Sequence, residues 1–248
     1  MKLALVGYGR MGQEVERLVA GSDRHKIVTI QRKHIGQALD TETLRQADVV
    51  IDFTVGELVP GHIKTYCDLG IDAVIGTTGW DAQDVGLQRQ VEQAGIGLIV
   101  GSNFSAGAQV FLQLVALASR QFHRLGAYDV YGFETHHAGK KDSPSGTAQI
   151  IATTIVNNFP PKTAARFDRA DGVIDPGELH FASLRGGRNP GQHEVTFDSA
   201  ADEVRLTHAA HSRSGFAEGA LLAAEYIHGK QGYMFFEQLF QKGGPYAP

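Results

Sequence analysis

The sequence has a single cysteine, Cys67, in 248 residues, so no internal disulfide can form. It also lacks any apolar run long enough to cross a bilayer. The amino-terminal stretch MKLALVGYGRMG passes from a very short apolar run into glycine and charge, which is unlike a signal peptide. Together these absences predict a protein of a reducing compartment, and we expect it in the cytoplasm.

An excess of one charge is absent too. The formal net charge is -4 and the isoelectric point is about 6.2, with no long basic run. Neither nucleic acid nor a membrane surface is therefore an expected partner. The apolar content of 42% is ordinary for a globular protein, and the length allows one large domain or two modest ones. We expect two domains.

The first hundred residues alternate short apolar runs with helical spacing, which predicts a doubly wound parallel sheet. The first run leads directly into Gly7, Gly9 and Gly12 of a GxGxxG pattern, and helical spacing follows. In this context the glycines favour dinucleotide binding, with backbone close to a pyrophosphate and a helix N-terminus facing its charge. An ordinary glycine-rich turn is the alternative. The predicted strands are 2–6, 27–30, 49–53, 73–75 and 97–100.

The end of the second predicted strand bears on cofactor choice. Folds of this kind usually place an acid there to bond the ribose 2′-hydroxyl, but this chain has Gln31, followed by Arg32 and Lys33. Two cations without an acid favour a 2′-phosphate, so we expect NADPH to be preferred and NADH to remain possible. A solvated basic turn is the alternative. A second turn, GTTG at residues 76–79, ends a strand where such sheets bind ligands.

The pattern changes after residue 105. A long helix is predicted at 109–122, apolar on most faces as if buried between domains. Strands predicted at 128–133, 179–184, 194–198 and 203–208 have few helices among them, which indicates a smaller α+β domain with a mixed, mostly antiparallel sheet. We expect residues 1–105 and 214–248 to form a dinucleotide-binding domain. Residues 106–213 are expected to form a second domain that pairs with another copy of the chain, because such a sheet is often covered in this way.

The stretch ETHHAGKKDSPSGTA, residues 134–148, combines paired histidines, paired lysines and the residues Ser145, Gly146 and Thr147 before an apolar helical run. A loop entering a helix N-terminus offers backbone N–H groups to anions, so we interpret it as a carboxylate pocket with an attached proton donor. The alternative is a solvated surface loop without a binding function. A zinc site is not expected, because adjacent histidines such as His136 and His137 rarely converge on one metal. A nucleophilic Ser145 would lack the GxSxG elbow.

Several of these segments occur together in one order, namely GYGRMG, IDFT, GTTGW, SNFSAG, the central motif, RGG with GQHEV, and SRSGF. In this the chain resembles the 4-hydroxy-tetrahydrodipicolinate reductase family over nearly its whole length. The resemblance implies NAD(P)H-dependent reduction in diaminopimelate and lysine biosynthesis, a Rossmann domain, a substrate domain with a mixed sheet, and a homotetramer. It also implies a small dicarboxylate as substrate.

Residue by residue, the resemblance implies that His136 is the acid and Lys140 the catalytic lysine. His137, Ser145, Gly146 and Thr147 fall on substrate-binding positions. An ordinary histidine pKa near 6.5 would let His136 supply a proton near neutrality. With the basic pair after the second strand included, the expected cofactor-binding residues are Gly7, Tyr8, Gly9, Arg10, Met11, Gly12, Arg32, Lys33, Gly76, Thr77, Thr78, Ser102, Asn103 and Phe104.

The chain departs from the family pattern in a glycine loop one residue shorter, in Ser143 where alanine is usual, and in Gln31 in place of the acid. Two other functions stay open at this point. A related two-domain Rossmann amino-acid or sugar dehydrogenase would explain the glycine loop but not HHxxK followed by PSGT. A catalytically silent NADPH-sensing protein would bind cofactor without turnover.

Overall fold

The structure is a computed structural model that describes residues 1–32 and 37–247, so the expected cofactor residue Lys33 lies outside the described residues. The chain divides into two compact units, Met1–Ala106 with Arg213–Pro248, and Gly107–Ser212. Among the described residues, no helix combines the length and apolar character needed to cross a bilayer. The α/β class expected from the sequence is confirmed.

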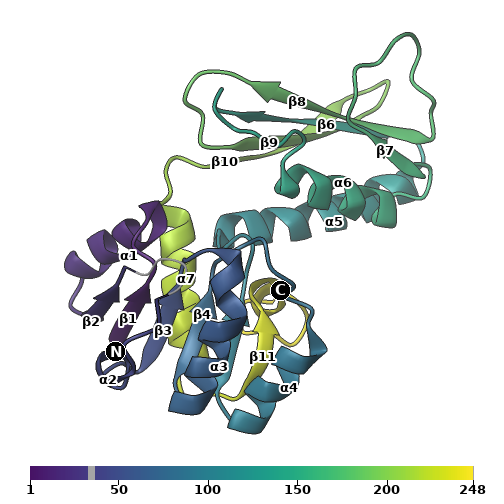
Figure 1. Cartoon of the computed structure of the whole chain (residues 1–248). Coiled ribbons are helices and arrows are strands. Elements are labelled where there is room, and N and C mark those ends of the chain that lie inside the picture. Colours follow the sequence, from purple (N-terminus) through teal and green to yellow (C-terminus); the bar gives the residue numbers. More distant parts are fainter. Residues whose placement is uncertain (33–36, 248) are drawn as a thin grey trace. The chain divides into compact units, whose positions relative to one another are not determined.

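The first unit contains a six-stranded sheet, drawn in Figure 1, with the order β11-β5-β4-β3-β1-β2. Every neighbouring pair in it is parallel. The strands are β1 (Lys2–Val6), β2 (Lys26–Gln31), β3 (Val49–Asp52), β4 (Asp72–Ile75), β5 (Gly97–Val100) and β11 (Gly232–Phe235). The helices are α1 (Arg10–Ala20), α2 (Thr41–Leu44), η1 (Gly56–Leu58), α3 (Val59–Leu69), α4 (Val85–Ala94), α7 (Ser214–Ile227) and η2 (Phe236–Phe240). The five strands predicted in the first hundred residues are all present.

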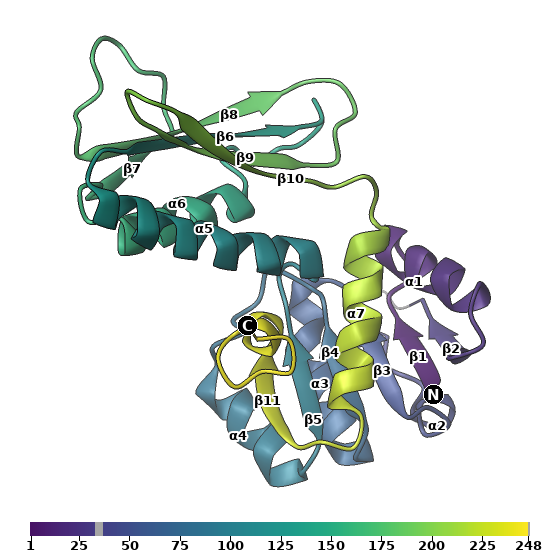
Figure 2. The ribbon, with the colours of Figure 1, turned by 180° about the vertical axis from the view of Figure 1, so that it is seen from behind.

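The sheet is buried because helices cover both of its faces. Alternate residues of β1 point to opposite faces, so Leu3 packs in the core beneath α1 and α7, while Ala4 packs in the core beneath α3 and α4. Figures 1 and 2 show these two helix pairs from opposite sides of the sheet. A strand buried on both sides has to be apolar throughout, which is why short apolar runs identified these strands.

The carboxyl-terminal segment returns to this first sheet, where β11 pairs in parallel with β5. Its helix α7 lies unusually close to the neighbouring backbone. A Cβ placed on Gly219 would come within 1.6 Å of the Phe104 carbonyl oxygen, so only glycine permits this approach. The buried alanines of α7 serve the same close packing.

The second unit holds a five-stranded sheet with the order β10-β9-β6-β8-β7. Its strands are β6 (Asp129–His136), β7 (Ala164–Arg166), β8 (Glu178–Arg185), β9 (Gln192–Asp198) and β10 (Glu203–Ala209), and its helices are α5 (Ala106–Leu125) and α6 (Gly146–Asn158). Both helices cover the same face of the sheet (Figure 1).

The mixed character expected of this second sheet is confirmed, and its antiparallel ladders contain more paired residues than its parallel ladders. The β10–β9 and β9–β6 pairs are antiparallel, whereas β6–β8 and β8–β7 are parallel. The helix α6 carries the chain from β6 to β7, and β8 then inserts between these two strands. The sequence obscured this crossover because β7 has only three residues and lies in a polar stretch.

The long helix α5 is buried on one face only. Phe111 and Val115 pack against the second sheet, whereas Val110, Leu114 and Leu117 are between 45% and 48% exposed in this chain. The sequence had led us to expect burial on most faces of this helix. In this chain only the face towards the second sheet is buried.

Candidate active site

The strand β6 delivers two titratable residues to the covered face of the second sheet. Side chains alternate between faces along a strand, so Glu134 and His136 point the same way as the core residue Val130. Glu134 is fully buried and His136 is 8% exposed. A carboxylate in such a place has to be compensated by hydrogen bonds.

The compensation comes from three donors on one carboxylate oxygen. Glu134 Oε1 accepts from the backbone N–H of Ser145, from Ser183 Oγ and from Arg185 Nη2, each at 2.8 Å. Burial alone raises the pKa of this carboxyl, but the nearby His193 ring and the hydrogen bonds from Ser145 and Arg185 outweigh it and hold the pKa well below its usual range. Glu134 is therefore a charged hub that joins β6, β8 and the start of α6.

His136 lies beside the other oxygen of this carboxylate, with Nδ1 3.0 Å from Glu134 Oε2. Burial lowers the pKa of His136 to about 4, although the Glu134 charge opposes that shift, and His193, Lys140 and Arg185 add to the lowering. The expectation of a pKa near 6.5 is thus wrong for the ligand-free protein. At neutral pH the imidazole is neutral.

Sequence reasoning missed a second histidine in this cluster. His193 Nε2 lies 3.5 Å from Glu134 Oε2 and 3.4 Å from Ser145 Oγ, and its ring centroid is 5.3 Å from that of His136. It is brought there by strand register, because His193 on β9 is paired with Glu134 on β6. The one available signal was a lone histidine in the alternating GQHEV segment.

Ser145 begins the helix α6 as its N-cap, and its Oγ accepts from the Ala148 N–H at 3.1 Å. The first N–H groups of the helix, at Gly146 and Thr147, follow directly after it. Ser145 does not form a hydrolase triad, because its own Oγ and the Glu134 carboxylate both face the same nitrogen of His193. The sequence expectation of a loop entering a helix is confirmed.

Lys140 and His137 lie in the loop between β6 and α6. The Lys140 ammonium is 2.9 Å from Asp142 Oδ1, and this hydrogen bond lowers the pKa of Asp142. Arg185 Nη2 also bonds the Asp142 carbonyl at 2.7 Å, which ties the loop to β8. The structure therefore brings His136 and Ser145 together at Glu134, while Lys140 contacts Asp142 at the rim.

Three residues of this cluster could together bind a metal ion, namely Glu134, His136 and His193. Each offers one ligand atom, and these atoms all lie within 4.8 Å of one another. Among the residues that the structure describes, this trio is the set suited to hold a divalent cation, and it does not include His137, the neighbour of His136. The Arg185 guanidinium on the same carboxylate lowers the affinity for a cation, because like charges repel.

The three glycines after β1 have the geometry that a dinucleotide requires. Gly7 has φ +85°, and a Cβ there would lie 2.4 Å from the Phe53 carbonyl oxygen. A Cβ on Gly12 would lie 2.4 Å from the Gly7 carbonyl oxygen, whereas one on Gly9 would meet nothing within 4 Å. Tight turn, close helix packing and an open surface at the N-cap of α1 fit a pyrophosphate at this loop.

Three of the expected cofactor residues line one hollow at the carboxyl ends of β4 and β5. Thr77, Thr78 and Ser102 share it with Trp80 and Phe235, among other residues. At the neighbouring Gly76, a Cβ would come within 2.0 Å of the Phe53 ring, so a larger residue would displace this turn. Open parallel sheets bind ligands at such strand ends.

The basic residues after β2 are only partly described. Arg32 is exposed and its guanidinium carbon lies 4.3 Å from the centroid of the Tyr8 ring. Gln31 points inward, where its side chain bonds the backbone N–H and C=O of Asp40. The structural role of Gln31 in holding Asp40, the N-cap of α2, was not visible in the sequence.

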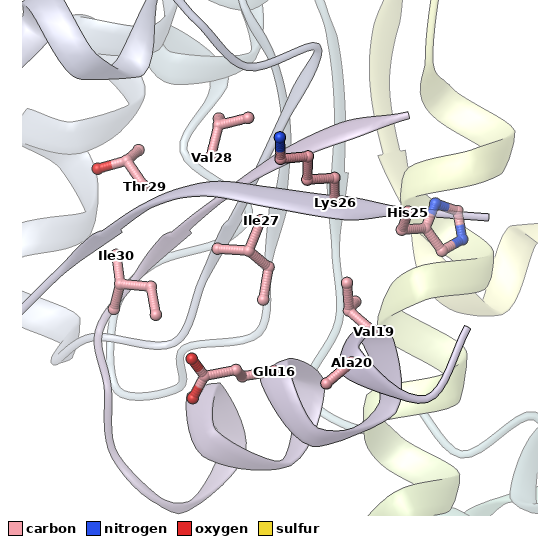
Figure 3. A pocket seen from close by; sticks show the side chains of 9 residues that line it. All are labelled: Glu16, Val19, Ala20, His25, Lys26, Ile27, Val28, Thr29 and Ile30. Carbon is pink, nitrogen blue, oxygen red and sulfur yellow. The ribbon is translucent and has the colours of Figure 1, made fainter. Parts of the chain in front are cut away.

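A second hollow lies between α1 and the edge strand β2 (Figure 3). Glu16 and His25 line it together with aliphatic side chains such as Ile27 and Ile30. It contains none of the residues expected to bind substrate or cofactor. We therefore place the candidate active site at Glu134 and the cofactor loop at Gly7–Gly12.

Comparison with known proteins gives one family. The family model described as "Dihydrodipicolinate reductase, N-terminus" matches residues 1–104, and "Dihydrodipicolinate reductase, C-terminus" matches residues 107–240. The 4-hydroxy-tetrahydrodipicolinate reductase of Christiangramia forsetii is 37% identical over 94% of both chains. That of Methanoregula boonei is 31% identical over 90% of both chains.

Among solved structures, the dipicolinate-bound dihydrodipicolinate reductase from Paenisporosarcina sp. TG-14 has a TM-score of 0.78 at 25% identity, over 96% of this chain and 98% of that one. An amine dehydrogenase from Mycobacterium smegmatis has a TM-score of 0.57 at 12% identity, a likeness of fold alone. The chain belongs to the dihydrodipicolinate reductase family, whose members are NAD(P)H-dependent oxidoreductases of diaminopimelate and lysine biosynthesis.

Proposed function

We propose that this chain reduces 4-hydroxy-tetrahydrodipicolinate, the hydrated form of dihydrodipicolinate, to tetrahydrodipicolinate, with His136 as the proton donor. The observation that carries the proposal is the buried pair of Glu134 and His136 beside the N-terminus of α6, in a chain of this family. A related amino-acid or sugar dehydrogenase and a silent NADPH sensor are not favoured, because relatives at 31–37% identity over most of the chain are named as this reductase.

The unit Gly107–Ser212 is the substrate-binding part in this proposal. The related Paenisporosarcina enzyme was solved with dipicolinate, a dicarboxylate. In this chain a carboxylate would accept from the first N–H groups of α6, at Gly146 and Thr147, and pair with the ammonium of Lys140 at the rim. His137, adjacent to the acid, would contact the same ligand. The Ser145 N–H and Oγ already serve Glu134 and Ala148, so Ser145 mainly positions the helix start.

The unit that contains Gly7, Gly9 and Gly12 is the cofactor-binding part, and the pyrophosphate would lie at the open face of Gly9. Thr77, Thr78 and Ser102, with Gly76, Asn103 and Phe104 beside them, would support the rest of the cofactor. A bound nicotinamide supplies the hydride. What the chain itself must supply is a fixed substrate and a proton at the atom that collects the electron pair.

The proton is supplied by His136, whose pKa of about 4 in the ligand-free protein leaves it neutral at pH 7. A substrate with two carboxylates brings negative charge next to the ring, which favours the imidazolium. We therefore expect His136 to take up its proton together with the substrate. Lys140 balances part of the ligand charge, so its loss should weaken binding as well as catalysis.

We further propose that NADPH is the preferred cofactor. Arg32 is exposed beside Tyr8, a residue of the glycine loop, and its planar guanidinium suits a 2′-phosphate. The structure describes no carboxylate within bonding distance of Arg32 that would occupy it. Lys33 stays part of this proposal as a second cation from the sequence.

We also propose a homotetramer. The face of the second sheet that α5 and α6 leave open carries Tyr131 and Leu184, which are 41% and 55% exposed. Both point to this face by strand alternation, and a partially apolar open sheet is suited to pair with a second copy. Sedimentation equilibrium should give a mass of four chains, and a monomer at micromolar concentration would refute the proposal.

The direct test is a coupled assay in which the substrate is made in situ from pyruvate and aspartate semialdehyde, with NADPH and NADH consumed in parallel reactions. Turnover that requires both the substrate-generating step and this chain is the expected result. Cofactor binding without turnover would support the sensor, and turnover only with amino acids or sugars would support the other dehydrogenases. Either result would overturn the proposed function.

A further inference from the structure

The two oxygens of the Glu134 carboxylate have different neighbours. Oε1 receives three donors, and two of them, the Ser145 backbone N–H and the Arg185 guanidinium, can never act as acceptors. Oε2 has no such donor and faces the rings of His136 and His193 at 3.0 and 3.5 Å. The carboxylate is therefore held in one orientation, with a free oxygen directed at the imidazoles.

This orientation decides where the proton of a neutral His136 resides. A ring nitrogen 3.0 Å from a carboxylate oxygen is stabilised when it carries hydrogen and destabilised when it presents a lone pair. The hydrogen of His136 is thus expected on Nδ1. The two atoms are close enough for a hydrogen bond, but the angle at the contact is not that of one, because neither atom has a hydrogen-bond partner in the structure. The second nitrogen, Nε2, is left for the reaction.

The surroundings of Nε2 agree with that role. A Cβ on Gly191 would lie 2.9 Å from His136 Nε2, so any other residue there would crowd this nitrogen. Gly191 also has φ +150°, a conformation that side chains other than glycine rarely adopt. It belongs to the GQHEV segment, which also supplies His193.

We propose that Glu134 is a positioning residue for the reduction: it holds His136 in the Nδ1–H tautomer and so makes Nε2 the atom that transfers the proton. This inference rests on the proposed function, in which His136 is the donor. Its rival is a purely structural Glu134 that only ties β6, β8 and α6 together through Oε1.

Glu134→Gln separates the two roles. The amide has the size of the carboxylate, and its oxygen must face Ser145 and Arg185 because both can only donate. Its NH₂ group is then directed at His136 Nδ1, which has to become an acceptor. The variant keeps the structural bonds of Oε1 and reverses the tautomer.

The experiment records long-range ¹H–¹⁵N spectra of the histidine rings in ¹⁵N-labelled full-length protein at pH 7, and His136→Gln identifies the His136 signals. Wild type should show hydrogen on Nδ1, and Glu134→Gln should show it on Nε2. In the coupled assay Glu134→Gln should lower kcat by about 10² to 10³, as expected for a wrong tautomer, with KM changed less than about threefold.

Glu178→Gln is the matched control, because it neutralises a carboxylate of the same sheet that is paired with Arg166 and distant from this cluster. It should leave the His136 tautomer and kcat unchanged. Glu134→Asp keeps a carboxylate, and it should keep the wild-type tautomer and at least about tenfold more kcat than the glutamine variant. An aspartate variant with the reversed tautomer would overturn the proposal, whether or not the glutamine variant folds.

Three further results would also overturn it. They are hydrogen on Nε2 in wild type, an unchanged tautomer in Glu134→Gln, or a reversed tautomer with kcat within about twofold of wild type. The tautomer is read without turnover, so the two proposals fail separately. A wild type with the expected tautomer and no activity in the coupled assay would refute the proposed function and leave the positioning of His136 by Glu134 intact.

Discussion

Each unit of the chain contains a buried carboxylate beside a histidine, and only one of them has the surroundings of a catalytic site. In the first unit, Asp52 accepts from His62 Nδ1 and from the Tyr66 hydroxyl, both at 2.8 Å. In the second, Glu134 lies 3.0 Å from His136 Nδ1. The pairs are alike in distance and burial, so a carboxylate and a histidine in contact do not by themselves identify chemistry.

What differs is the other ring nitrogen and the neighbourhood. His62 Nε2 is buried without a hydrogen-bond partner in the structure, whereas His136 Nε2 has a glycine, Gly191, beside it. Near His136 the chain adds a helix N-terminus and Lys140, both suited to an anionic ligand. We therefore interpret Asp52 and His62 as a structural pair that holds the end of β3, since Asp52 Oδ1 also bonds the backbone and hydroxyl of Thr54.

The largest expected difference between the two pairs is the effect of replacing the histidine on kcat. His136→Gln should lower kcat by about 10² to 10⁴ with a modest change in KM, because a general acid acts in the transition state. His62→Gln should keep kcat within about threefold but lower the free energy of unfolding by about 3 kcal/mol, because it leaves a buried carboxylate short of a partner. Steady-state kinetics and urea unfolding of both variants measure this. Near-normal kcat in His136→Gln would remove it from the mechanism.

The two pairs also show what the sequence could and could not predict. Apolar runs, the glycine loop and the PSGT helix start are local patterns, so they predicted the first sheet and the position of α6. The hub around Glu134 is not local, because Ser183 and His193 reach it only through pairing of β6 with β8 and β9. No periodicity in the sequence specifies that register.

The pKa of His136 was unpredictable for the same reason. Its ordinary value is a property of the residue, but burial, which lowers it to about 4, is a property of the assembled sheet and helices. Gln31 is similar. Glutamine at this position indicated that the usual acid is missing. The inward direction of its side chain depends on a hydrogen bond with Asp40, nine residues later.

A smaller effect is expected on cofactor preference in the first unit. NADPH should have a lower KM than NADH by about ten- to a hundredfold, the value of one charge-assisted contact of about 1.5 to 3 kcal/mol. Arg32→Ala should erase most of that difference and leave NADH kinetics nearly unchanged. His62→Gln, in the same unit, should keep the preference. Equal weakening of both cofactors by Arg32→Ala would show that Arg32 does not read the 2′-phosphate.

The smallest expected effect concerns proton uptake, and it distinguishes the two histidines without catalysis. The pKa of His136 is about 4 in the ligand-free protein, where burial lowers it, Glu134 raises it, and His193, Lys140 and Arg185 lower it further. A bound dicarboxylate adds negative charge and raises this pKa in the complex. Between the two pKa values the complex holds more protons than the free protein, so binding takes up protons and affinity falls as pH rises, by at most about tenfold per pH unit.

Calorimetry with dipicolinate in buffers of different ionisation enthalpy measures this uptake directly between pH 5.5 and 7.5. Wild type and His62→Gln should take up a fraction of one proton per site, and the fraction should decrease towards the higher pH. His136→Gln should take up none, because it removes the group whose pKa changes. The same uptake in His136→Gln as in wild type would place the proton on another group, and His193, which shares the Glu134 carboxylate, would be the first to examine.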